Sequence, residues 1–440
     1  MSDIQKIECM LTITEEQFRE YGEHRDLLRK SIHPTPIPVS HQCRACLSTD
    51  LELFLDFGMQ PLAGGFLTKE QIPQEQKYPL RIYVCQECGL VQIFDVIPMG
   101  TLFDNYLFSS STVQYLVNHF ANYAKWLNDN YHPEFVIEFG CNDGVLLEPL
   151  KQYGIKSVGV DISQNITELA RGKGLNAITG YFDPRMAHEI AHEYGYADIV
   201  TGSNAFPHND EPGNILQAAQ VLLKGNGHLV LEMMYAGALL EKLQWDSMYH
   251  EHLNYFCLST LEVLLLRYGF HAVHAEIVPM HAGSLRVVCA VDPSEYPDNT
   301  VTEMLRKEMA DGLQVVGTWR RFADDVHRQI RIVKETLFDL THGGFGDCPK
   351  IAAYGASGRA TMWLNACNMD YLEYIVDESP LRAGKLMPGM HTPIVTPDRF
   401  KERPPDYCLV TAWNYFEQIR QKHLDYTGVW VLPAPDMRFV

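Results

Sequence analysis

The feature that most constrains the fold is an alternation of short apolar runs with helical segments that begins at Glu134. Four runs, FVIEF, SVGVD, ADIVT and HLVLE, follow one another in this way. Strands that are buried on both faces read as nearly continuous apolar runs, because helices cover both sides of a parallel sheet. We therefore predict an α/β domain with a Rossmann-like parallel sheet over residues 106–300.

A second alternation lies near the end of the chain, with the runs KIAAYG, LEYIVD, DYCLVT and GVWVL. A long polar stretch with helical spacing, from Thr302 to Leu340, precedes it. Residues 301–440 are therefore predicted to form a helical connector and a second, C-terminal Rossmann-like α/β domain. The length of 440 residues is enough for about three domains of ordinary size.

The region before the first alternation divides into two parts. Residues 1–40 are predicted to form an N-terminal arm, with one amphipathic helix over Thr14–Ser31 and a proline-rich joint behind it. Its function cannot be read from these residues. Residues 41–105 carry short β-like runs and are predicted to form a small separate module.

Two cysteine pairs bracket this small module, Cys43-Arg-Ala-Cys46 and Cys85-Gln-Glu-Cys88. The spacing lets both thiolates of a pair reach one metal ion from a single turn, and four thiolates suit tetrahedral Zn²⁺. A closed four-cysteine site leaves no position for water, so the predicted role of the zinc is structural. The alternative is four unrelated buried thiols.

The charge of the chain excludes some partners. It has 55 acidic and 36 basic residues, a formal net charge of −19, and no local basic patch, so we predict that it does not bind nucleic acid. The residues after Met1 lack the pattern of a secretory signal, and no uncharged apolar stretch of about eighteen residues occurs. We expect a cytoplasmic protein without a membrane partner.

A glycine turn follows the strand that ends at Phe139. Glycines at such a turn let the backbone pass close to a ligand, and Asp161, 21 residues after Gly140, is placed to accept hydrogen bonds from ribose hydroxyls. The acidic and amide side chains of the turn disfavour phosphate and suit a cationic sulfonium, so the predicted cofactor is S-adenosylmethionine. The alternative is a turn that binds nothing. The predicted cofactor residues are Glu138, Gly140, Asn142, Asp143, Gly144, Asp161, Phe182 near the adenine and Asn204 near the methionine end.

A histidine-rich segment, Tyr249-His-Glu-His-Leu-Asn-Tyr-Phe256, lies beyond the fourth strand. Two histidines two residues apart suit either metal binding or proton transfer. The sequence offers no third convergent ligand, which favours general-base chemistry. For His250 a purely structural role in the core stays open.

Taken together and in order, these motifs resemble the three-domain deoxysugar C-methyltransferases, which act on nucleotide-linked keto sugars. The resemblance covers about residues 41–440. It rests on the cysteine pairs and on the segments 60–63 (QPLA), 106–110 (YLFSS), 138–144 (EFGCNDG), 204–208 (NAFPH), 249–256 (YHEHLNYF), 281–286 (HAGSLR) and 354–389.

The resemblance implies a base that removes the proton beside a sugar ketone, which gives an enolate that attacks the cofactor's methyl group, at C3 of a 4-keto sugar. It assigns His252 as the base, Tyr249 and Glu251 as its neighbours, and His208 as a second histidine facing the site. A tyrosine hydroxyl suits the task of stabilising negative charge on the ketone oxygen.

Further substrate contacts are implied by the same resemblance. Tyr106 matches an aromatic near the substrate, against the alternative of a core aromatic, and Ser284 and Arg286 match residues that hold the diphosphate. In the last domain Arg359 and Trp413 are candidate substrate contacts, with Asp377 and Arg382 as weaker ones. The turn 357–359 departs from the family's proline-containing turn, which puts the identity of the nucleotide in doubt.

Three other functions stay open at this point. One is O- or N-methylation of a different small molecule. Another is a zinc-dependent interaction protein with an inactive methyltransferase domain, and the last is an oxidoreductase that binds a nicotinamide dinucleotide in its final domain.

Overall fold

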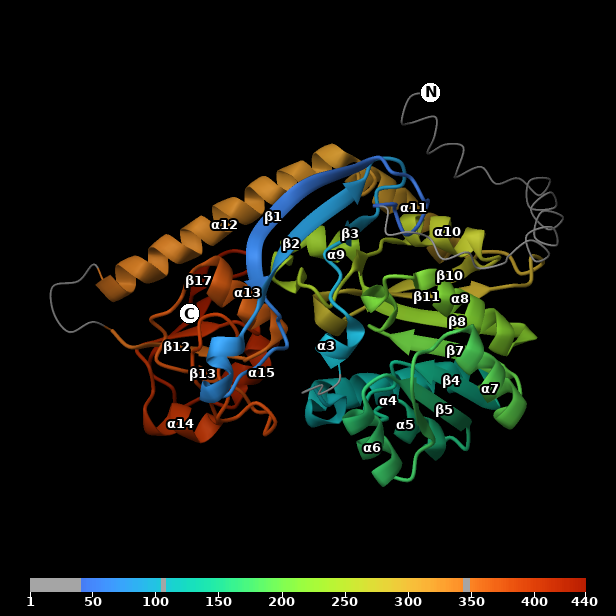
Figure 1. Cartoon of the computed structure of the whole chain (residues 1–440), viewed down its shortest axis with the longest axis horizontal. Helices are drawn as coiled ribbons and strands as arrows, with labels where there is room; N and C mark the ends of the chain where they lie inside the picture. The colour runs from blue at the N-terminus through green and yellow to red at the C-terminus, as the bar shows by residue number, and fades with distance from the viewer. Residues whose placement is uncertain (1–40, 104–107, 343–348) are drawn as a thin grey trace.

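The computed structural model describes residues 41–103, 108–342 and 349–440, and these form three sheets with helices around them (Figure 1). The predicted helix over Thr14–Ser31 and the candidate substrate residue Tyr106 lie outside the described residues. None of the described helices combines the length and the apolar composition needed to cross a bilayer.

The central sheet has the strand order β10-β11-β8-β7-β4-β5-β6. Its strands are β4 (Phe135–Phe139), β5 (Lys156–Asp161), β6 (Ala177–Thr179), β7 (Ala197–Ser203), β8 (Leu223–Met234), β10 (His271–Val278) and β11 (Ser284–Ala290). Strands β4 to β8 pair in parallel, and β11 is antiparallel to both of its neighbours. The predicted parallel α/β core is therefore confirmed.

The central strand β4 explains why its sequence is apolar throughout. All five of its residues are buried, and Ile137 belongs to one apolar cluster whereas Val136 belongs to another. Both faces of the sheet are therefore covered. The helices of this domain are α4 (Gln114–Tyr131), α5 (Leu147–Gln152), α6 (Gln164–Gly172), α7 (Pro184–Tyr194), α8 (Pro212–Leu222), α9 (Ala236–Glu241) and α10 (Leu258–Arg267).

The small N-terminal sheet is antiparallel and has the order β1-β2-β3-β9. Strands β1 (Leu51–Pro61), β2 (Lys77–Cys85) and β3 (Val91–Ile93) come from the cysteine module, which α3 (Met99–Phe103) follows. The fourth strand, β9 (Asn254–Tyr255), comes from the histidine-rich segment and pairs with β3. The cysteine module and that segment therefore share one sheet.

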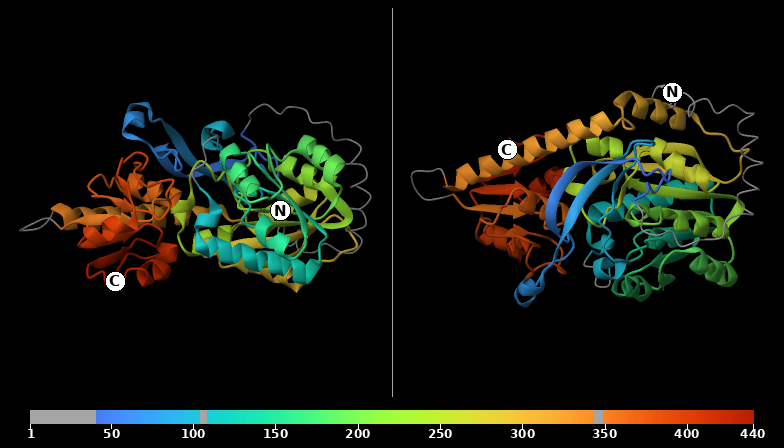
Figure 2. Two further views of the ribbon diagram at one scale, coloured as in Figure 1. Left: turned by 90° about the horizontal axis from the view of Figure 1, so that it is seen from below. Right: turned by 45° about the horizontal axis from the view of Figure 1, so that its top comes forward.

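The β1–β2 ribbon extends from the cysteine module to the last domain (Figures 1 and 2). There Leu67 forms a bridge with Leu386, and the Glu75 carboxylate accepts hydrogen bonds from the Gly389 N–H and from His391 Nε2, each at 2.7 Å. The ribbon thus links the two ends of the molecule.

The last domain is a second sheet of the predicted type, with the order β14-β13-β12-β15-β16-β17. Its pairs are parallel except β16 with β17. Its elements are β12 (Ile351–Tyr354), α13 (Gly358–Ala366), β13 (Ile375–Val376), β14 (Ile394–Val395), α14 (Pro397–Glu402), β15 (Tyr407–Val410), α15 (Phe416–Gln421), β16 (Val429–Leu432) and β17 (Arg438–Phe439).

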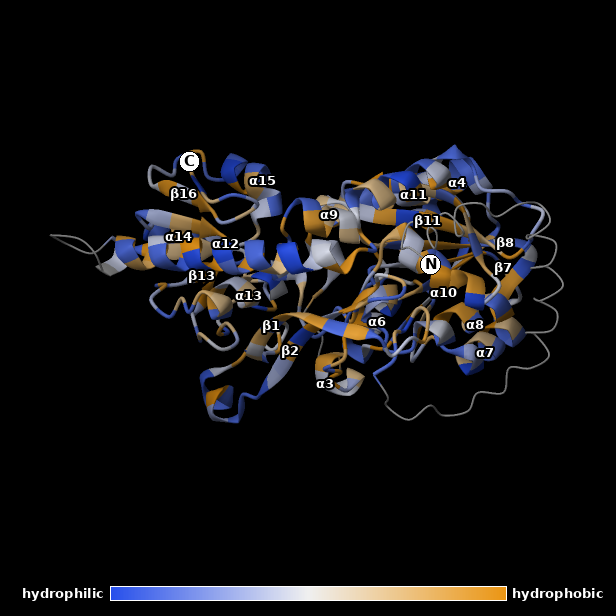
Figure 3. Ribbon diagram, turned by 90° about the horizontal axis from the view of Figure 1, so that it is seen from above, coloured by the Kyte–Doolittle hydropathy of each residue, from blue (hydrophilic) through white to orange (hydrophobic). Residues whose placement is uncertain are grey.

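The connector differs from its prediction in one respect. The stretch Thr302–Leu340 lies in two helices, α11 (Asn299–Asp311) and α12 (Val316–His342), because Gly312 adopts a left-handed φ of 68° and ends the first helix. Helix α12 runs along the ribbon, where Arg320 pairs with Glu52. In Figure 3 it shows hydrophilic and hydrophobic segments in turn, as expected for a helix with one buried face.

Six short 3₁₀ helices join these elements, within the described residues. They are η1 (Lys69–Gln74), η2 (Ser110–Thr112), η3 (Phe206–His208), η4 (Trp245–Ser247), η5 (Met280–Ala282) and η6 (Trp413–Tyr415).

Candidate active site

A cavity of about 1250 Å³ lies between the carboxyl ends of the central strands and the last domain. All three sheet regions contribute to its wall. The lining includes Gly140 and Asp161 from the central domain, Gly64 and Phe66 from the segment after β1, and Gly355, Arg359 and Arg382 from the last domain. In open parallel sheets ligands bind at this carboxyl edge, so the position suits a substrate and a cofactor together.

The glycine turn after β4 is held in a conformation that only glycine tolerates. Gly140 has a φ of 67°, and a Cβ atom there would lie 2.3 Å from the Ala205 Cβ. Gly144 has a φ of 82° and packs in the same way against Leu175. Gly140 lines the cavity, whereas Gly144 serves the packing of the turn against the sheet.

Two acidic residues of the predicted cofactor site lie beside the turn, Asp161 partly buried and Glu138 fully buried. The Asp161 carboxylate accepts backbone N–H groups of Asn142 at 3.0 Å and Ser163 at 2.9 Å, and it lines the cavity. Glu138 is 1% exposed, and its Oε2 has no hydrogen-bond partner among the described residues. Burial and the nearby carboxylate of Asp161 raise the pKa of Glu138 well above its usual value. A cationic ligand would offset this crowding of acidic groups, so the residues fit a sulfonium.

The predicted adenine and methionine contacts also reach the cavity. The Phe182 ring stacks on Phe139 at a centroid distance of 5.1 Å, and both rings line the wall. Asn204 lines it as well, with a φ of 55°. Asn142 also lines the cavity, and its side-chain oxygen accepts a hydrogen bond from the Ser110 N–H at 2.9 Å.

Asp143 has a different place from the one predicted. Its buried carboxylate accepts the Ser109 hydroxyl at 2.6 Å and the Ser111 hydroxyl, and Lys173 Nζ lies 3.4 Å away. It is not among the described residues that line the cavity. Asp143 therefore fixes the segment in front of α4.

The histidine-rich segment brings three predicted residues to the cavity wall, and a fourth, His208, comes from the 3₁₀ helix after β7. The His252 ring lies 4.1 Å from the Tyr249 ring and 4.9 Å from the His208 ring, measured between centroids, and Glu251 lines the wall beside them. His252 Nδ1 donates to the Ser247 carbonyl oxygen at 2.7 Å. A carbonyl only accepts, so this bond fixes the tautomer and leaves Nε2 of His252 free to take a proton.

The ionisation of these groups places neutral imidazoles beside a protonated phenol. Burial lowers the pKa of His208 to about 4, and burial and the His208 imidazole lower the pKa of His252 well below its usual value. Both rings are therefore neutral at neutral pH. Burial raises the pKa of Tyr249, which keeps its hydroxyl protonated, and raises the pKa of Glu251 to about 7.

His250 serves the fold, in line with the structural alternative. Its Nε2 donates to the Pro79 carbonyl oxygen at 3.0 Å, and its ring is 1% exposed. It is not among the described residues of the cavity wall.

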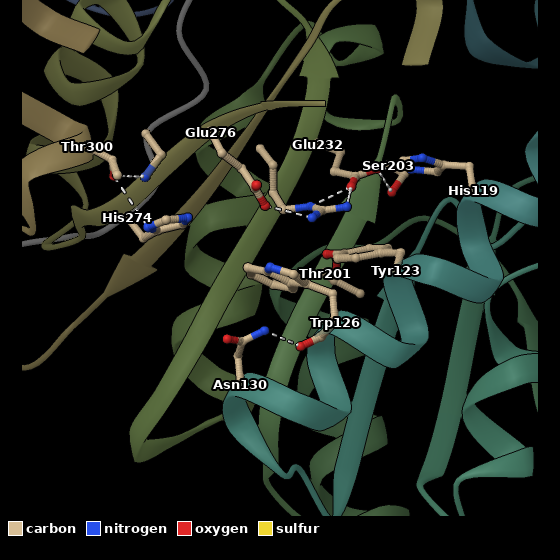
Figure 4. A network of polar contacts seen from close by, with 12 residues as sticks. His119, Tyr123, Trp126, Asn130, Thr201, Ser203, Glu232, His274, Glu276 and Thr300 are labelled. Carbon is tan, nitrogen blue, oxygen red and sulfur yellow. Dashed lines mark hydrogen bonds and ion pairs between the residues drawn. The ribbon is translucent and has the colours of Figure 1, made fainter. Parts of the chain in front are cut away.

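Three of the candidate substrate residues are engaged elsewhere. Arg286 pairs with Glu232 at 2.5 Å and with Glu276 at 2.7 Å. Figure 4 shows both carboxylates in this network, with Tyr123 and Trp126 beside them. The Ser284 hydroxyl donates to Met280 O at 3.1 Å, and Trp413 Nε1 donates to Asp246 at 2.8 Å. None of these three is among the described residues that line the cavity. Their polar groups form hydrogen bonds and ion pairs with neighbouring protein residues instead.

Two other guanidinium groups do face the cavity. Arg359 Nη2 donates to Gln244 at 2.7 Å, and its buried Nη1 lies 3.7 Å from Asp246 Oδ1 in an ion pair but forms no hydrogen bond with any described residue. Arg382 Nη1 donates to Ala356 O at 2.8 Å and to Asp377 Oδ2 at 3.3 Å, and its buried Nε has no hydrogen-bond partner among the described residues. Buried guanidinium N–H groups without partners suit an anionic ligand. The sequence named Arg382 only weakly, because no motif marks it.

The four cysteines form one cluster. Their sulfur atoms all lie within 4.8 Å of one another, with Cys43 to Cys88 and Cys46 to Cys85 at 3.5 Å. Tetrahedral zinc with bonds of about 2.3 Å separates its sulfur ligands by roughly 3.8 Å, so the four thiols fit this metal. The four cysteines are not among the described residues that line the cavity. Arg44, which lies between Cys43 and Cys46 in the sequence, nevertheless pairs with Asp210 at 2.5 Å, and Asp210 lines the cavity.

Comparison with known proteins gives three family models in succession along the chain. Residues 43–103 match a "Putative zinc binding domain", residues 115–275 a "Methyltransferase domain", and residues 279–435 a "C-methyltransferase C-terminal domain". The cysteine cluster lies in the first of these and the glycine turn in the second.

Similar proteins fall into two groups. C-methyltransferase NovU of Streptomyces niveus is 31% identical over 409 residues, which cover 91% of this chain and 96% of NovU. The ubiquinone biosynthesis O-methyltransferase of Vibrio campbellii is 27% identical over 110 residues, which cover 24% of this chain and 47% of that protein. Among solved structures, the magnesium protoporphyrin IX methyltransferase of Synechocystis with bound SAH matches 40% of this chain and 83% of its own, at 17% identity and a TM-score of 0.32.

Proposed function

This chain belongs to the C-methyltransferase family and is an S-adenosylmethionine-dependent methyltransferase, and from that premise we propose that it methylates C3 of a nucleotide-linked 4-keto-deoxysugar. The observation that carries the proposal is one cavity whose wall holds three things: the cofactor turn, a histidine with a free nitrogen, and two guanidinium groups with unpaired N–H donors. Such a wall suits an acceptor that has an acidic C–H at one end and a diphosphate at the other.

The cofactor has a place in the central domain. Asp161 would accept its ribose hydroxyls, the Phe139 and Phe182 rings would contact its adenine, and Asn204 would bind its methionine end. Bound there, S-adenosylmethionine supplies an electrophilic methyl group on a positively charged sulfur.

The protein's own groups would perform the proton transfer. His252 Nε2 takes the proton from C3 of the sugar, and negative charge builds on the C4 ketone oxygen, where the Tyr249 hydroxyl donates a hydrogen bond. The enolate carbon then forms a bond to the methyl group as the methyl–sulfur bond breaks, and the proton on His252 leaves to solvent. Alignment of the carbon with the methyl group is the remaining task of the cavity.

The diphosphate would lie against the last domain. Arg286 and Ser284 are not among the described residues of the cavity wall, whereas Arg359 and Arg382 line it and each has a buried N–H group without a hydrogen bond. We therefore propose Arg359 and Arg382 as the groups that hold the diphosphate. This changes the residues that the family resemblance implied and keeps the chemistry, since a guanidinium fork matches two phosphate oxygens.

The experiment is a reaction of the purified protein with S-adenosylmethionine and a panel of nucleotide-linked 4-keto-6-deoxysugars, followed by mass spectrometry. The expected results are a methyl-mass gain and, without cofactor, exchange of one sugar C–H with solvent deuterium. Deuterium exchange requires a carbon acid and is absent from simple O- or N-methyl transfer. A mass gain without exchange would contradict the enolate, and no gain with any sugar would contradict the acceptor class. Two variants form a matched pair. Arg359→Gln should weaken binding of the free nucleoside diphosphate, whereas Arg286→Gln should lower the stability of the protein and leave that affinity unchanged.

The acid side of the pH profile gives a separate prediction. The base works only when neutral, and the pKa of His252 is lowered. In a Glu251→Gln protein, which lacks the neighbouring carboxyl group with a pKa of about 7, kcat/KM should therefore stay constant as the pH falls through 6.5 and decline only below it. An exposed histidine would lose half of its base form near pH 6.5. Circular dichroism at each pH is the control, because proteins with buried neutral histidines lose stability below that pH. A midpoint at or above 6.5 with intact fold would contradict the prediction.

A further inference from the structure

His281 lies in the turn between β10 and β11 and has an unusual backbone. Its φ and ψ are 49° and 34°, Ala282 follows with a φ of 63°, and Gly283 with 132°. Side chains other than glycine, asparagine and aspartate rarely adopt the left-handed region, and two such residues in succession are rarer still. The surrounding structure must therefore hold this turn in place.

Four hydrogen bonds hold the turn. Lys242 Nζ donates to Ala282 O at 2.5 Å, and the Tyr115 hydroxyl donates to Pro279 O at 2.7 Å. The Met280 carbonyl oxygen accepts the Gly283 N–H at 2.8 Å and the Ser284 hydroxyl at 3.1 Å. Ser284 thus supports the turn from behind. All of these contacts fix the backbone, and none restrains the His281 imidazole.

The side chain of His281 belongs to the cavity wall. It lines the same cavity as His252 and Arg359, and no described residue forms a hydrogen bond with its ring. The groups that act on it electrostatically are Arg359, the imidazoles of His119 and His208, and the Glu232 carboxylate. Burial first and Arg359 second lower the pKa of His281 to about 3, so its ring is neutral at neutral pH and has one donor and one acceptor nitrogen.

We propose that His281 binds the acceptor directly, through a hydrogen bond to a hydroxyl group on the sugar between the reacting carbon and the diphosphate. This inference rests on the proposed function. A hydroxyl both donates and accepts, as a neutral imidazole does, and no charge is needed. His281 lines the same cavity as His252, the proposed base, and Arg359, the proposed diphosphate ligand, so it faces the space that such an acceptor would occupy. The constrained turn fixes the backbone that carries the imidazole, so only the side-chain freedom of His281 is lost on binding.

The test is the substitution His281→Asn, because asparagine tolerates the left-handed backbone and removes the imidazole. We expect KM for the acceptor to rise about five- to tenfold, the range for one lost hydrogen bond, with a smaller change in kcat. The affinity for S-adenosylhomocysteine, measured by calorimetry, and the Tm should match the unaltered protein. The matched control is His132→Asn, since His132 also has a positive φ, 43°, but is exposed at the end of α4.

A second measurement identifies the contact. The unaltered protein should lose affinity for an acceptor that lacks the sugar hydroxyl, and the His281→Asn protein should not distinguish the two acceptors. An unchanged KM in the variant overturns the inference, and so does a loss confined to S-adenosylhomocysteine affinity, which would assign His281 to the cofactor. If the unaltered protein methylates no sugar of the panel, the proposed function fails first and the inference falls with it.

Discussion

Replacing His252 with asparagine is expected to lower kcat for methyl transfer by about 10²- to 10⁴-fold, the range for loss of a general base. Asparagine can still donate a hydrogen bond to Ser247 O, as His252 Nδ1 does at 2.7 Å, so the local backbone keeps its support. What asparagine lacks is a nitrogen that accepts a proton from carbon. Single-turnover methyl transfer should fall, and exchange of the sugar C–H with solvent deuterium should fall by a similar factor, because both require the same proton transfer.

The matched control is His250→Asn, two residues away in the same segment. His250 bonds to Pro79 O on the ribbon and is absent from the described cavity wall, so its loss should reduce stability and leave deuterium exchange within a fewfold of normal. Exchange that persists in the His252 variant would show that another group is the base. Calorimetry with S-adenosylhomocysteine would show whether each variant still binds the cofactor product.

Replacing Cys88 with serine is expected to abolish zinc binding and to lower the free energy of unfolding by about 5 kcal/mol or more, since the ion's binding energy stabilises the folded module. For a domain of this size that corresponds to a fall in Tm of roughly 10 °C or more. The four sulfur atoms lie within 4.8 Å of one another and need the metal between them. The measurements are zinc content by elemental mass spectrometry and unfolding by calorimetry.

The control for this experiment is Cys408→Ala. Cys408 is as deeply buried, in β15, and lies outside the cluster, so its replacement should leave the zinc content unchanged and cost about 1 kcal/mol. A Cys88 variant that lacks zinc but unfolds at the normal temperature would contradict the prediction that zinc stabilises the fold.

The strands of both α/β domains were predictable because burial on two faces leaves a local trace in the sequence. The residue pattern of β4, for instance, requires helices on both sides of the sheet. The pairing of β9 with β3 was not predictable, since a strand of two residues, Asn254–Tyr255, has no periodicity and finds its partner far away in the chain. The break at Gly312 was also missed, because polar helical spacing continues on both sides of it.

The candidate site divides in the same way. The cysteine cluster, the glycine turn and His252 could be named as candidates because each belongs to a short motif of residues that lie close together in the sequence. The place of Arg286 depends instead on Glu232 and Glu276, which approach from the two neighbouring strands, and no local pattern reports which carboxylates meet a guanidinium. Arg382 was named only as a weaker candidate, and the segment 281–286 was singled out for Ser284 and Arg286 and not for His281, because both cavity positions depend on the meeting of distant segments.

The sharing of one sheet by the cysteine module and the histidine-rich segment limits how relatives of this protein can be recombined. Strand β3 is hydrogen-bonded to β9, Asn254 binds the Pro207 and Asn209 carbonyls, and Arg44 binds Asp210. A chimaera that exchanged residues 43–103 alone would keep the family's order of domains. Its cysteine module would, however, have to pair with a histidine-rich segment from a different protein. The cysteine module and the histidine-rich segment should therefore be exchanged together, with the crossover point after β9 and not between the domains.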